Sequence, residues 1–236
     1  MKQKKDTLVI IPVLNEEKNI AAVIDELHRV CNDIDIMVIN DGSTDATTEI
    51  LQRKKVLAIN HSFNMGIGVS FQTGCQYALK EGYRYIVRMD GDGQHNPRFI
   101  NTILEPIKND YVDIVIGSRF LGKSEFISSR PRLIGIKIIS LFLSFITRKK
   151  ITDPTSGFCA MNKKAFSFFS KVCPDDYPEP EILVYHRNFK IKEFPIPINK
   201  RLGGISSITP LKSLYYMLKV LFSLFVHIFR DKKAIK

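Results

Sequence analysis

Cysteines are few in this 236-residue sequence, and none of them is placed as in a metal or disulfide motif. They are Cys31, Cys75, Cys159 and Cys173, at wide and unrelated spacings. This spacing argues against a zinc site or a disulfide framework and favours a reducing cytoplasm. The start of the chain, MKQKKDTLVI, also lacks the apolar stretch and small-residue cleavage site of a signal peptide. We therefore expect a cytoplasmic location.

Acidic residues are scarce in two parts of the chain, which gives the protein a net charge of +11. Residues 119–150 contain eight Lys/Arg and one Asp/Glu, and residues 185–236 contain eleven and two. Both basic segments adjoin long apolar runs, and their basic residues alternate with Leu, Ile and Phe. This pattern favours an anionic membrane surface over nucleic acid as the partner.

Neither an internal repeat nor a low-complexity linker interrupts the first half of the chain, which alternates between two hydrophobic patterns. Short apolar runs rich in β-branched residues are typical of parallel strands covered on both faces. They cover residues 7–13, 34–40, 56–60, 83–89 and 112–117. Helices are expected between them, over about 15–30, 43–54, 68–80 and 97–108. This alternation predicts an α/β fold with a Rossmann-like, open, mostly parallel sheet and flanking helices.

After Arg119 the periodicity is weaker, and no domain boundary is evident. Residues 130–150 have the pattern of a helix with a thin polar stripe at spacings of three and four. The stripe consists of Lys137, Ser140, Ser144 and Arg148. Four more elements are expected beyond it: a loop over 151–158, a helix from Lys163, a helix over 181–188 and a strand over 190–198.

The last segment has the pattern of an amphipathic helix that begins after Thr209, with Thr209 as N-cap. Its strongly polar residues, except Ser213, fall in one stripe: Lys212, Tyr216, Lys219, Ser223, His227 and Arg230. A bilayer-spanning helix would place Lys219 in hydrocarbon, so we expect the helix to lie on the membrane surface. The alternative is packing in the core or in an oligomer interface. We therefore expect a catalytic domain over 1–209 and a membrane-associating or oligomerising helix with a basic tail over 210–236.

Two carboxylates follow the fourth expected strand directly, in the motif MDGDGQH at residues 89–95. If the extended backbone continues, Asp90 and Asp92 point to the same side of the chain. The carboxyl ends of strands are where open α/β sheets bind ligands. Carboxylates flanked by glycines suit a hard divalent cation, Mg²⁺ or Mn²⁺, which would neutralise a diphosphate leaving group. The alternative is a solvated turn, because Asp and Gly are favoured in turns.

Polar residues also follow the second and third expected strands. Asp41, in the segment DGSTD, is placed to accept hydrogen bonds from a ribose or a base. The alternative is a helix cap formed by Ser43 or Asp45. Asn64 begins the segment NMGIG, in which Gly66 permits close approach of the backbone at a helix start. This segment lacks the full dinucleotide-binding fingerprint.

Taken together, four segments resemble the motifs of the family 2 glycosyltransferases and occur in that family's order. They are VIIPVLNEEKNI (9–20), VINDGSTDAT (38–47), NMGIGVSFQTGCQYA (64–78) and MDGDGQHNP (89–97). Within the family, the chain is most similar to the polyprenyl-phosphate sugar synthases of the dolichyl-phosphate mannose synthase type. This likeness is carried by GSRF (117–120), ITDPTSGF (151–158) and RLGGISS (201–207). The resemblance covers about residues 6–210 and implies the GT-A fold.

The resemblance also implies the roles of the site residues. The nucleotide sugar would be bound by Pro12, Asn15, Glu16, Asp41, Asn64, Gly66 and Asp90, and the metal by Asp90, Asp92 and Gln94. An acceptor phosphate would meet Arg119, Arg130 or Arg132, and Ser156, while Arg201 would close over the donor diphosphate from a mobile loop. Guanidinium groups suit the binding of both the acceptor phosphate and the donor diphosphate. The alternative for one of the pair Arg130 and Arg132 is a solvated surface position.

The catalytic residues implied are Asp92, Arg201 and a base at Glu181, with Glu179 as its neighbour. A hydroxyl acceptor needs such a base, whereas a phosphate acceptor is already an anion. The alternative for Glu181 is a negative residue that favours a helix N-terminus. Two positions depart from the pattern of the branch: Ser207 replaces a common Lys, and Cys159 replaces Arg. Both bear on the acceptor and not on the donor chemistry.

We expect an inverting glycosyltransferase that moves a sugar from a nucleoside-diphosphate sugar to a lipid-linked polyprenyl phosphate, bound peripherally to the inner face of the cell membrane. One alternative keeps the donor and extends a cell-wall or surface polysaccharide. A sugar nucleotidyltransferase would need a Gly-rich, basic loop after the first strand, where PVLNEE is acidic. A non-catalytic nucleotide-binding module would not need both Asp90 and Asp92. Whether the chain forms a homo-oligomer stays open.

Overall fold

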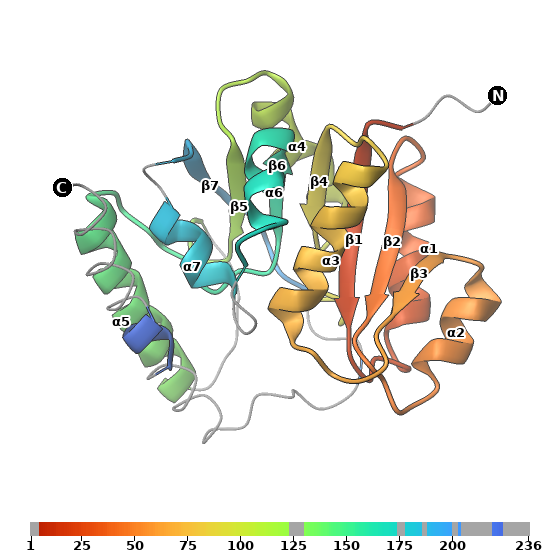
Figure 1. Ribbon diagram of the computed structural model, residues 1–236. Coiled ribbons are helices and arrows are strands. Elements are labelled where there is room, and N and C mark those ends of the chain that lie inside the picture. Colours follow the sequence, from red (N-terminus) through yellow and green to blue (C-terminus); the bar gives the residue numbers. More distant parts are fainter. Residues whose placement is uncertain are drawn as a thin grey trace.

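The computed structural model describes residues 5–122, 130–173, 178–185, 188–199, 203 and 219–223, with only the backbone of Arg130, Pro131 and Glu181. Seven strands form one sheet, and helices cover both of its faces (Figure 1). The predicted α/β fold with flanking helices is therefore confirmed.

The sheet is mostly parallel, as the sequence predicts. Its strands are β1 (Thr7–Val13), β2 (Asp35–Asn40), β3 (Leu57–Asn60), β4 (Tyr85–Arg88), β5 (Ile114–Ser118), β6 (Cys159–Asn162) and β7 (Ile191–Pro195). Their order across the sheet is β3-β2-β1-β4-β6-β5-β7. The sequence does not predict β6, which lies antiparallel between β4 and β5. This strand has only four residues and leads directly into a helix, so it is too short to show a periodic pattern.

The described helices agree in number and position with most of those expected from the sequence. They are α1 (Ile20–Val30), α2 (Thr47–Lys54), α3 (Ile67–Lys80), the 3-10 turn η1 (Pro97–Phe99) with α4 (Ile100–Lys108), α5 (Arg130–Thr147), α6 (Lys163–Phe169) and α7 (Pro178–Val184). Residues 219–223 are also helical. The rest of the expected C-terminal helix lies outside the described residues.

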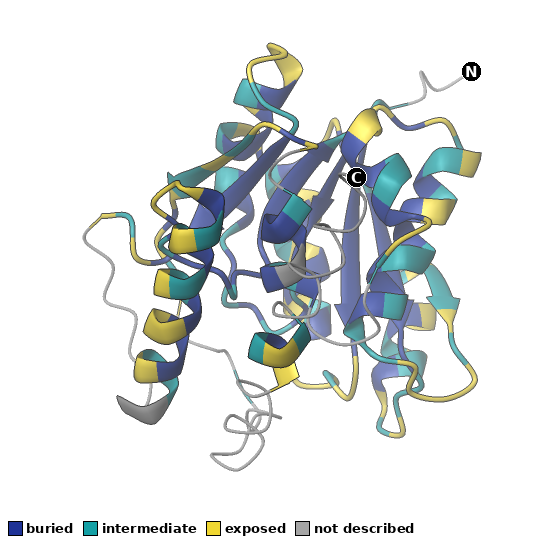
Figure 2. Cartoon of the chain, turned by 60° about the vertical axis from the view of Figure 1, so that its left-hand side comes forward, coloured by how far each residue is buried: buried dark blue, intermediate teal, exposed yellow. Residues whose placement is uncertain are grey.

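Two apolar clusters, one on each face of the sheet, form the core. α1 and α4 cover one face, where Leu27 and Ile103 are fully buried. α3 and α6 cover the other face, with Phe71 and Phe166, and α5 joins the same cluster through Ile139 beside α7. All seven residues of β1 are buried, as Figure 2 shows for the centre of the sheet. Burial on both faces explains why this strand reads as one continuous apolar run.

Two helices begin later than the sequence predicts. α1 begins at Ile20 and not near Asn15, and α2 begins at Thr47 and not near Ser43. The loops before these helices are bonded to each other: the Asn15 N–H donates to Ser43 Oγ at 2.9 Å, and the Glu16 N–H donates to Thr47 Oγ1 at 3.0 Å. These long-range bonds satisfy N–H groups that the first turn of a longer helix would leave without an intrahelical partner. A local pattern does not reveal them.

α5 forms over the expected residues, but its polar stripe does not face solvent as a unit. Ser140 Oγ donates to the Ile151 carbonyl at 2.6 Å, and the Ile151 N–H donates to Ser144 Oγ at 2.9 Å. The solvent-exposed side is instead largely apolar. We call Ile134, Ile138, Leu141 and Phe145 the α5 apolar face; their exposed fractions are 60%, 46%, 63% and 85%.

Candidate active site

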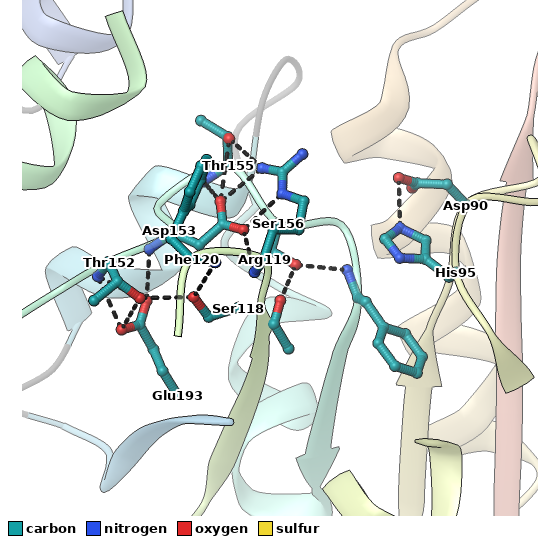
Figure 3. Close-up of polar contacts among 12 residues, drawn as sticks. Asp90, His95, Ser118, Arg119, Phe120, Thr152, Asp153, Thr155, Ser156 and Glu193 are labelled. Atoms are coloured by element: carbon teal, nitrogen blue, oxygen red, sulfur yellow. Dashed lines mark hydrogen bonds and ion pairs between the residues drawn. The ribbon is translucent and has the colours of Figure 1, made fainter. Parts of the chain in front are cut away.

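The carboxyl ends of β1, β2, β4 and β5 lie at one edge of the sheet, because these strands run in the same direction. β6 runs in the opposite direction, so the loop before it, residues 152–158, reaches the same edge. Figure 3 shows residues of this loop near Arg119, with Asp90 and His95 beside them. Open α/β sheets bind their ligands at this edge.

Asp41 lies at the end of β2 and is buried, with an exposed fraction of 4%. Its Oδ1 is 2.8 Å from His61 Nδ1 and accepts from the Met65 N–H at 3.0 Å. Its Oδ2 accepts from the Gly66 N–H at 2.9 Å, where Gly66 has a φ of 99°. Asp41 therefore holds the loop that precedes α3. Neither helix capping nor a contact with a nucleotide is needed to explain its burial, and its nucleotide role stays a prediction.

The other residues expected at the nucleotide have different surroundings. Pro12 is buried inside β1, next to Ile39 of β2. Asn15 is exposed, has a left-handed φ of 55°, and accepts from the Thr44 N–H at 2.8 Å. Asn64 is also exposed, and its Oδ1 accepts from the Gly66 N–H at 3.0 Å. The structure thus places Asn15 and Asn64 on loops at the ligand-binding edge, and Pro12 within the sheet.

The loop after β1 contacts a residue far away in the sequence. Asn19 Nδ2 donates to Glu16 Oε2 at 2.6 Å and to the Gly203 carbonyl at 3.2 Å. Gly203 lies two residues beyond Arg201, which is itself outside the described residues. Gly203 therefore contacts the same loop as Glu16.

Asp90 follows β4, and its side chain is 35% exposed, with neighbours on two sides of its carboxylate. Its Oδ2 is 3.1 Å from His95 Nε2, and the His95 ring stacks on Phe158 with 5.1 Å between centroids. A Cβ on Gly157 would overlap both Asp90 carboxylate oxygens, so any larger residue there would force this carboxylate to move. Burial raises the pKa of Asp90, but the His95 hydrogen bond and the charges around it outweigh burial, and the pKa is lowered overall.

One oxygen of Asp90 has no hydrogen-bond donor among the described residues. Asp90 Oδ1 is buried and, within the described part of the chain, accepts no hydrogen bond. Asp92 lies in the turn that follows, where its Oδ1 accepts from the Gln94 N–H at 3.0 Å. The described residues contain no group of three or more His, Cys, Asp or Glu that could hold a metal by itself. Asp90 and Asp92 therefore fit a cation that takes its remaining ligands from a bound substrate, and they do not form a closed protein site.

Arg119, at the end of β5, is held by a buried carboxylate. Its Nε and Nη2 donate to Asp153 Oδ2 and Oδ1, each at 2.6 Å, and its backbone N–H donates to the same carboxylate at 3.0 Å (Figure 3). Nη2 also donates to Thr155 Oγ1 at 2.6 Å. Glu193 of β7 accepts from the Asp153 N–H at 2.8 Å. Arg119 is thus fixed in place by the loop that contains Ser156.

Ser156 is buried, and its hydroxyl is bound to the backbone. It donates to the Gly117 carbonyl at 2.5 Å and accepts from the Phe158 N–H at 3.3 Å. Arg132 lies in the first turn of α5 and is partly exposed. The side chain of Arg130 lies outside the described residues. The acceptor roles of these three residues stay predictions.

The two candidate bases lie on α7. The Glu181 side chain is outside the described residues, whereas Glu179 forms an ion pair with the fully buried Arg88 of β4. Sequence reasoning missed Arg88, although an arginine inside the apolar run YIVRM is a visible signal. It also missed Asp153, Glu193 and His95, whose importance follows only from contacts across the fold.

Comparisons with known proteins agree with this architecture. The sequence model of glycosyl transferase family 2 matches residues 8–169. The UDP-N-acetylglucosamine–dolichyl-phosphate N-acetylglucosaminyltransferase of Methanococcus voltae is 35% identical over 184 residues, 69% of this chain and 72% of that protein. The polyprenol monophosphomannose synthase of Mycolicibacterium smegmatis is 27% identical over 216 residues, 86% of this chain and 81% of that protein.

A solved structure shares the fold. Glucosyl-3-phosphoglycerate synthase of Mycobacterium tuberculosis, crystallised with Mn²⁺, uridine diphosphate and glucosyl-3-phosphoglycerate, has a TM-score of 0.68 at 16% identity. The match covers 93% of this chain and 80% of that one. The mostly parallel sheet and the GT-A neighbours identify a GT-A fold, and the family match covers most of the sheet and its ligand-binding edge. The chain therefore belongs to the family 2 glycosyltransferases.

Proposed function

We propose that this glycosyltransferase transfers a sugar from a nucleoside-diphosphate sugar to a polyprenyl phosphate, with inversion, at the cytoplasmic face of the membrane. The two relatives named above support the acceptor class, since their names specify polyprenol and dolichyl phosphate. The mycobacterial structural neighbour supports the donor class, since it was crystallised with uridine diphosphate. The observation in this chain that carries the proposal is the Asp90 carboxylate at the end of β4, with one oxygen left without a hydrogen bond among the described residues.

Asp90 and Asp92 are the residues that would hold Mg²⁺ or Mn²⁺, with Gln94 beside them. The fit rests on the unbonded Asp90 Oδ1 and on the lowered pKa of Asp90, which keeps the carboxylate ionised. The cation, when bound, would neutralise negative charge on the leaving diphosphate. The neighbour that was crystallised with Mn²⁺ supports this assignment.

The remaining residues of the edge would divide between the two substrates. Asn15, Glu16, Asn64 and Gly66 belong to the loops that surround Asp41, and we assign them, with Pro12 and Asp41, to the nucleotide. Arg119, Arg132 and Ser156, with Arg130, would form the acceptor side. Arg201 would close over the donor diphosphate, and the contact of Gly203 with Asn19 supports this position. A phosphate acceptor needs no base, so Glu181 would be dispensable for proton removal.

We assign contact with an anionic membrane to α5 and the C-terminal segment. The α5 apolar face is exposed beside the basic residues Arg148, Lys149 and Lys150, which are also exposed. An apolar surface flanked by basic residues is typical of helices at the lipid interface. Over the described residues, no helix is both long enough and apolar enough to cross a bilayer. On this proposal, residues 1–209 form the catalytic domain, and residues 210–236 complete the membrane contact.

The proposal is tested with the purified full chain in two steps. A donor-hydrolysis screen over nucleotide sugars with Mn²⁺ identifies the donor. Polyprenyl phosphate and, in parallel, soluble oligosaccharides are then supplied as acceptors. We expect transfer to polyprenyl phosphate, and we expect its loss when EDTA removes the metal. Transfer to oligosaccharides alone would identify a polysaccharide-extending enzyme and contradict the lipid acceptor.

A further inference from the structure

Arg88 is a cation buried inside the central sheet. It is the last residue of β4, it has no exposed surface, and its guanidinium carbon lies 5.5 Å from the centre of the Phe71 ring. Burial lowers the pKa of Arg88, but the carboxylates of Glu179 and Asp90 outweigh it and raise the pKa overall, so Arg88 remains charged. A buried charge is costly unless a counter-ion accompanies it. The choice of counter-ion therefore matters for the site beside it.

Two carboxylates lie near the same nitrogen of Arg88. Nη2 donates to Glu179 Oε1 of α7 and lies 3.9 Å from Asp90 Oδ1. The Glu179 side chain is only 12% exposed, so little solvent screens this pair. Asp90 Oδ1 has no hydrogen-bond partner within the described ranges, and the same holds for Arg88 Nε and Nη1. Arg88 thus has two nitrogens, Nε and Nη1, without an acceptor among the described residues. Asp90 Oδ1 has no donor and lies close enough to Arg88 that a small movement would join them.

We propose that Glu179 is a positioning residue that holds Arg88 Nη2 on α7 and keeps it from closing the remaining 3.9 Å to Asp90, so that the Asp90 carboxylate stays free to bind a divalent cation. The inference rests on the metal site assigned under Proposed function. Without Glu179, Arg88 would lose its counter-ion, and Asp90 would be the nearest replacement. A guanidinium–carboxylate pair at Asp90 would then oppose the binding of a second cation there.

This assignment separates Glu179 from a role as general base. Its Oε1 is occupied by Arg88, and removal of its charge would strand a cation inside the sheet. Glu179 would affect the reaction indirectly, because it positions Arg88 and thereby changes cation binding at Asp90. A purely structural ion pair would change stability and leave cation affinity unaltered, so the two roles predict different measurements.

The experiment measures Mn²⁺ affinity of the full chain by electron paramagnetic resonance of free Mn²⁺, and melting temperature in parallel. We expect Glu179→Gln to weaken Mn²⁺ binding about tenfold, which corresponds to about 1.4 kcal/mol. The double variant Arg88→Met/Glu179→Gln removes the competing cation and is expected to return to within about threefold of the original affinity. Asp25→Asn on α1, which breaks an exposed ion pair with Lys54 of α2, is the matched control and is expected to bind Mn²⁺ normally.

Each outcome decides the inference. Normal Mn²⁺ affinity in folded Glu179→Gln would overturn it, and so would failure of the double variant to recover. If Glu179→Gln does not fold, Arg88→Met decides: it should bind Mn²⁺ at least as tightly as the unchanged chain, and a tenfold loss would overturn the inference. If the unchanged chain takes up no Mn²⁺, the proposed metal site is wrong and the inference falls with it. If the unchanged chain binds Mn²⁺ and the Glu179→Gln variant binds it equally well, the role of Glu179 is wrong and the proposed metal site still stands.

Discussion

Several residues at the candidate site are fixed by contacts within the protein. Asp41 accepts three hydrogen bonds from the segment 61–66, and Arg119 makes a two-pronged pair with Asp153. Asp90 lies between His95 and the backbone of Gly157. Side chains that are already ordered lose less conformational freedom when a ligand binds. At this scale, substitutions that shift a side chain without unfolding the protein are the informative ones.

Gly157→Ala is expected to damage the metal site without damaging the fold. The added Cβ would come within 2.5 Å of both Asp90 carboxylate oxygens, so the carboxylate has to move. A side chain of this length can rotate away, and we expect a loss of stability below about 1 kcal/mol. Mn²⁺ affinity and transfer rate should each fall about tenfold or more. Titration with Mn²⁺ and a melting curve on the same sample measure both effects.

Gly82→Ala is the control, and we expect it to lower stability without lowering activity. Gly82 has a left-handed φ of 75°, and a Cβ there would meet nothing within 4 Å. The strain should cost about 1 kcal/mol of stability and leave transfer unchanged, because the position is far from the carboxyl edge. If Gly157→Ala behaves like Gly82→Ala, the close approach of Gly157 to Asp90 is unimportant for activity.

Glu181→Gln distinguishes the two acceptor classes. On the proposed function the acceptor phosphate is already an anion, so the variant should retain transfer to polyprenyl phosphate within about threefold. A hydroxyl acceptor would need the base, and its transfer should fall by about a hundredfold or more. Initial rates with each acceptor at saturating donor measure the difference. A severe loss with polyprenyl phosphate in a folded variant would contradict our assignment of Glu181.

At the scale of elements, α5 is divided between core and surface. Ile139 and Leu143 are fully buried in the core cluster, where α5 packs against α7, whereas the α5 apolar face points away from the described body of the protein. Val220, in the described part of the C-terminal segment, belongs to the same core cluster as Ile139. Lys219 and Phe222 beside it are exposed. The C-terminal segment therefore packs on the protein through at least one residue, as the core-packing alternative requires, while other residues face outward.

Leu141→Ser combined with Phe145→Ser is expected to weaken membrane binding and leave the fold intact. Both side chains are more than 60% exposed, so the folded protein loses little by their replacement. An apolar side chain that enters lipid contributes about 1.5–3 kcal/mol, so binding to vesicles with anionic phosphatidylglycerol should weaken at least tenfold. Vesicle co-sedimentation measures the change. Tyr111→Ser, at a 73% exposed position outside α5, is the matched control and should bind normally.

At the scale of the whole molecule, the net charge of +11 is unevenly distributed along the chain. The loops after β1 and β2, which we assign to the nucleotide, contain Glu16, Glu17, Asp41 and Asp45, whereas basic residues follow β5 and dominate the last fifty positions. Charge of this kind attracts anionic lipid over about a Debye length, which is about 10 Å in 0.1 M salt and 3 Å in 1 M salt. The attraction should therefore depend on ionic strength.

Vesicle binding by the full chain is expected to fall at least tenfold between 0.1 M and 1 M NaCl. Each basic residue near an anionic surface contributes about 1 kcal/mol at low salt, and screening removes most of it. Vesicles of neutral phosphatidylcholine serve as the control and should bind weakly at both concentrations. Binding that does not respond to salt would show that the basic segments do not contact lipid.

Much of the fold could be predicted from the sequence. Buried parallel strands such as β1 and β2 read as apolar runs because both of their faces are covered, and the helices between them follow from the periodicity. The beginnings of α1 and α2 could not be predicted, since bonds between loops about thirty residues apart decide them. β6 was missed because four residues between a loop and a helix carry no periodic signal.

The sequence by itself determined the α/β class, the position of the Asp90 and Asp92 motif after a strand, and the glycosyltransferase family. These features depend on neighbours in the chain, through periodicity and motif spacing. Only the tertiary structure decided what surrounds each residue: that Asp153 holds Arg119, that Gly157 makes room for Asp90, and that Arg88 is buried against Glu179. Such pairs join residues tens of positions apart, because sheet order and strand direction, not distance along the chain, bring their side chains together.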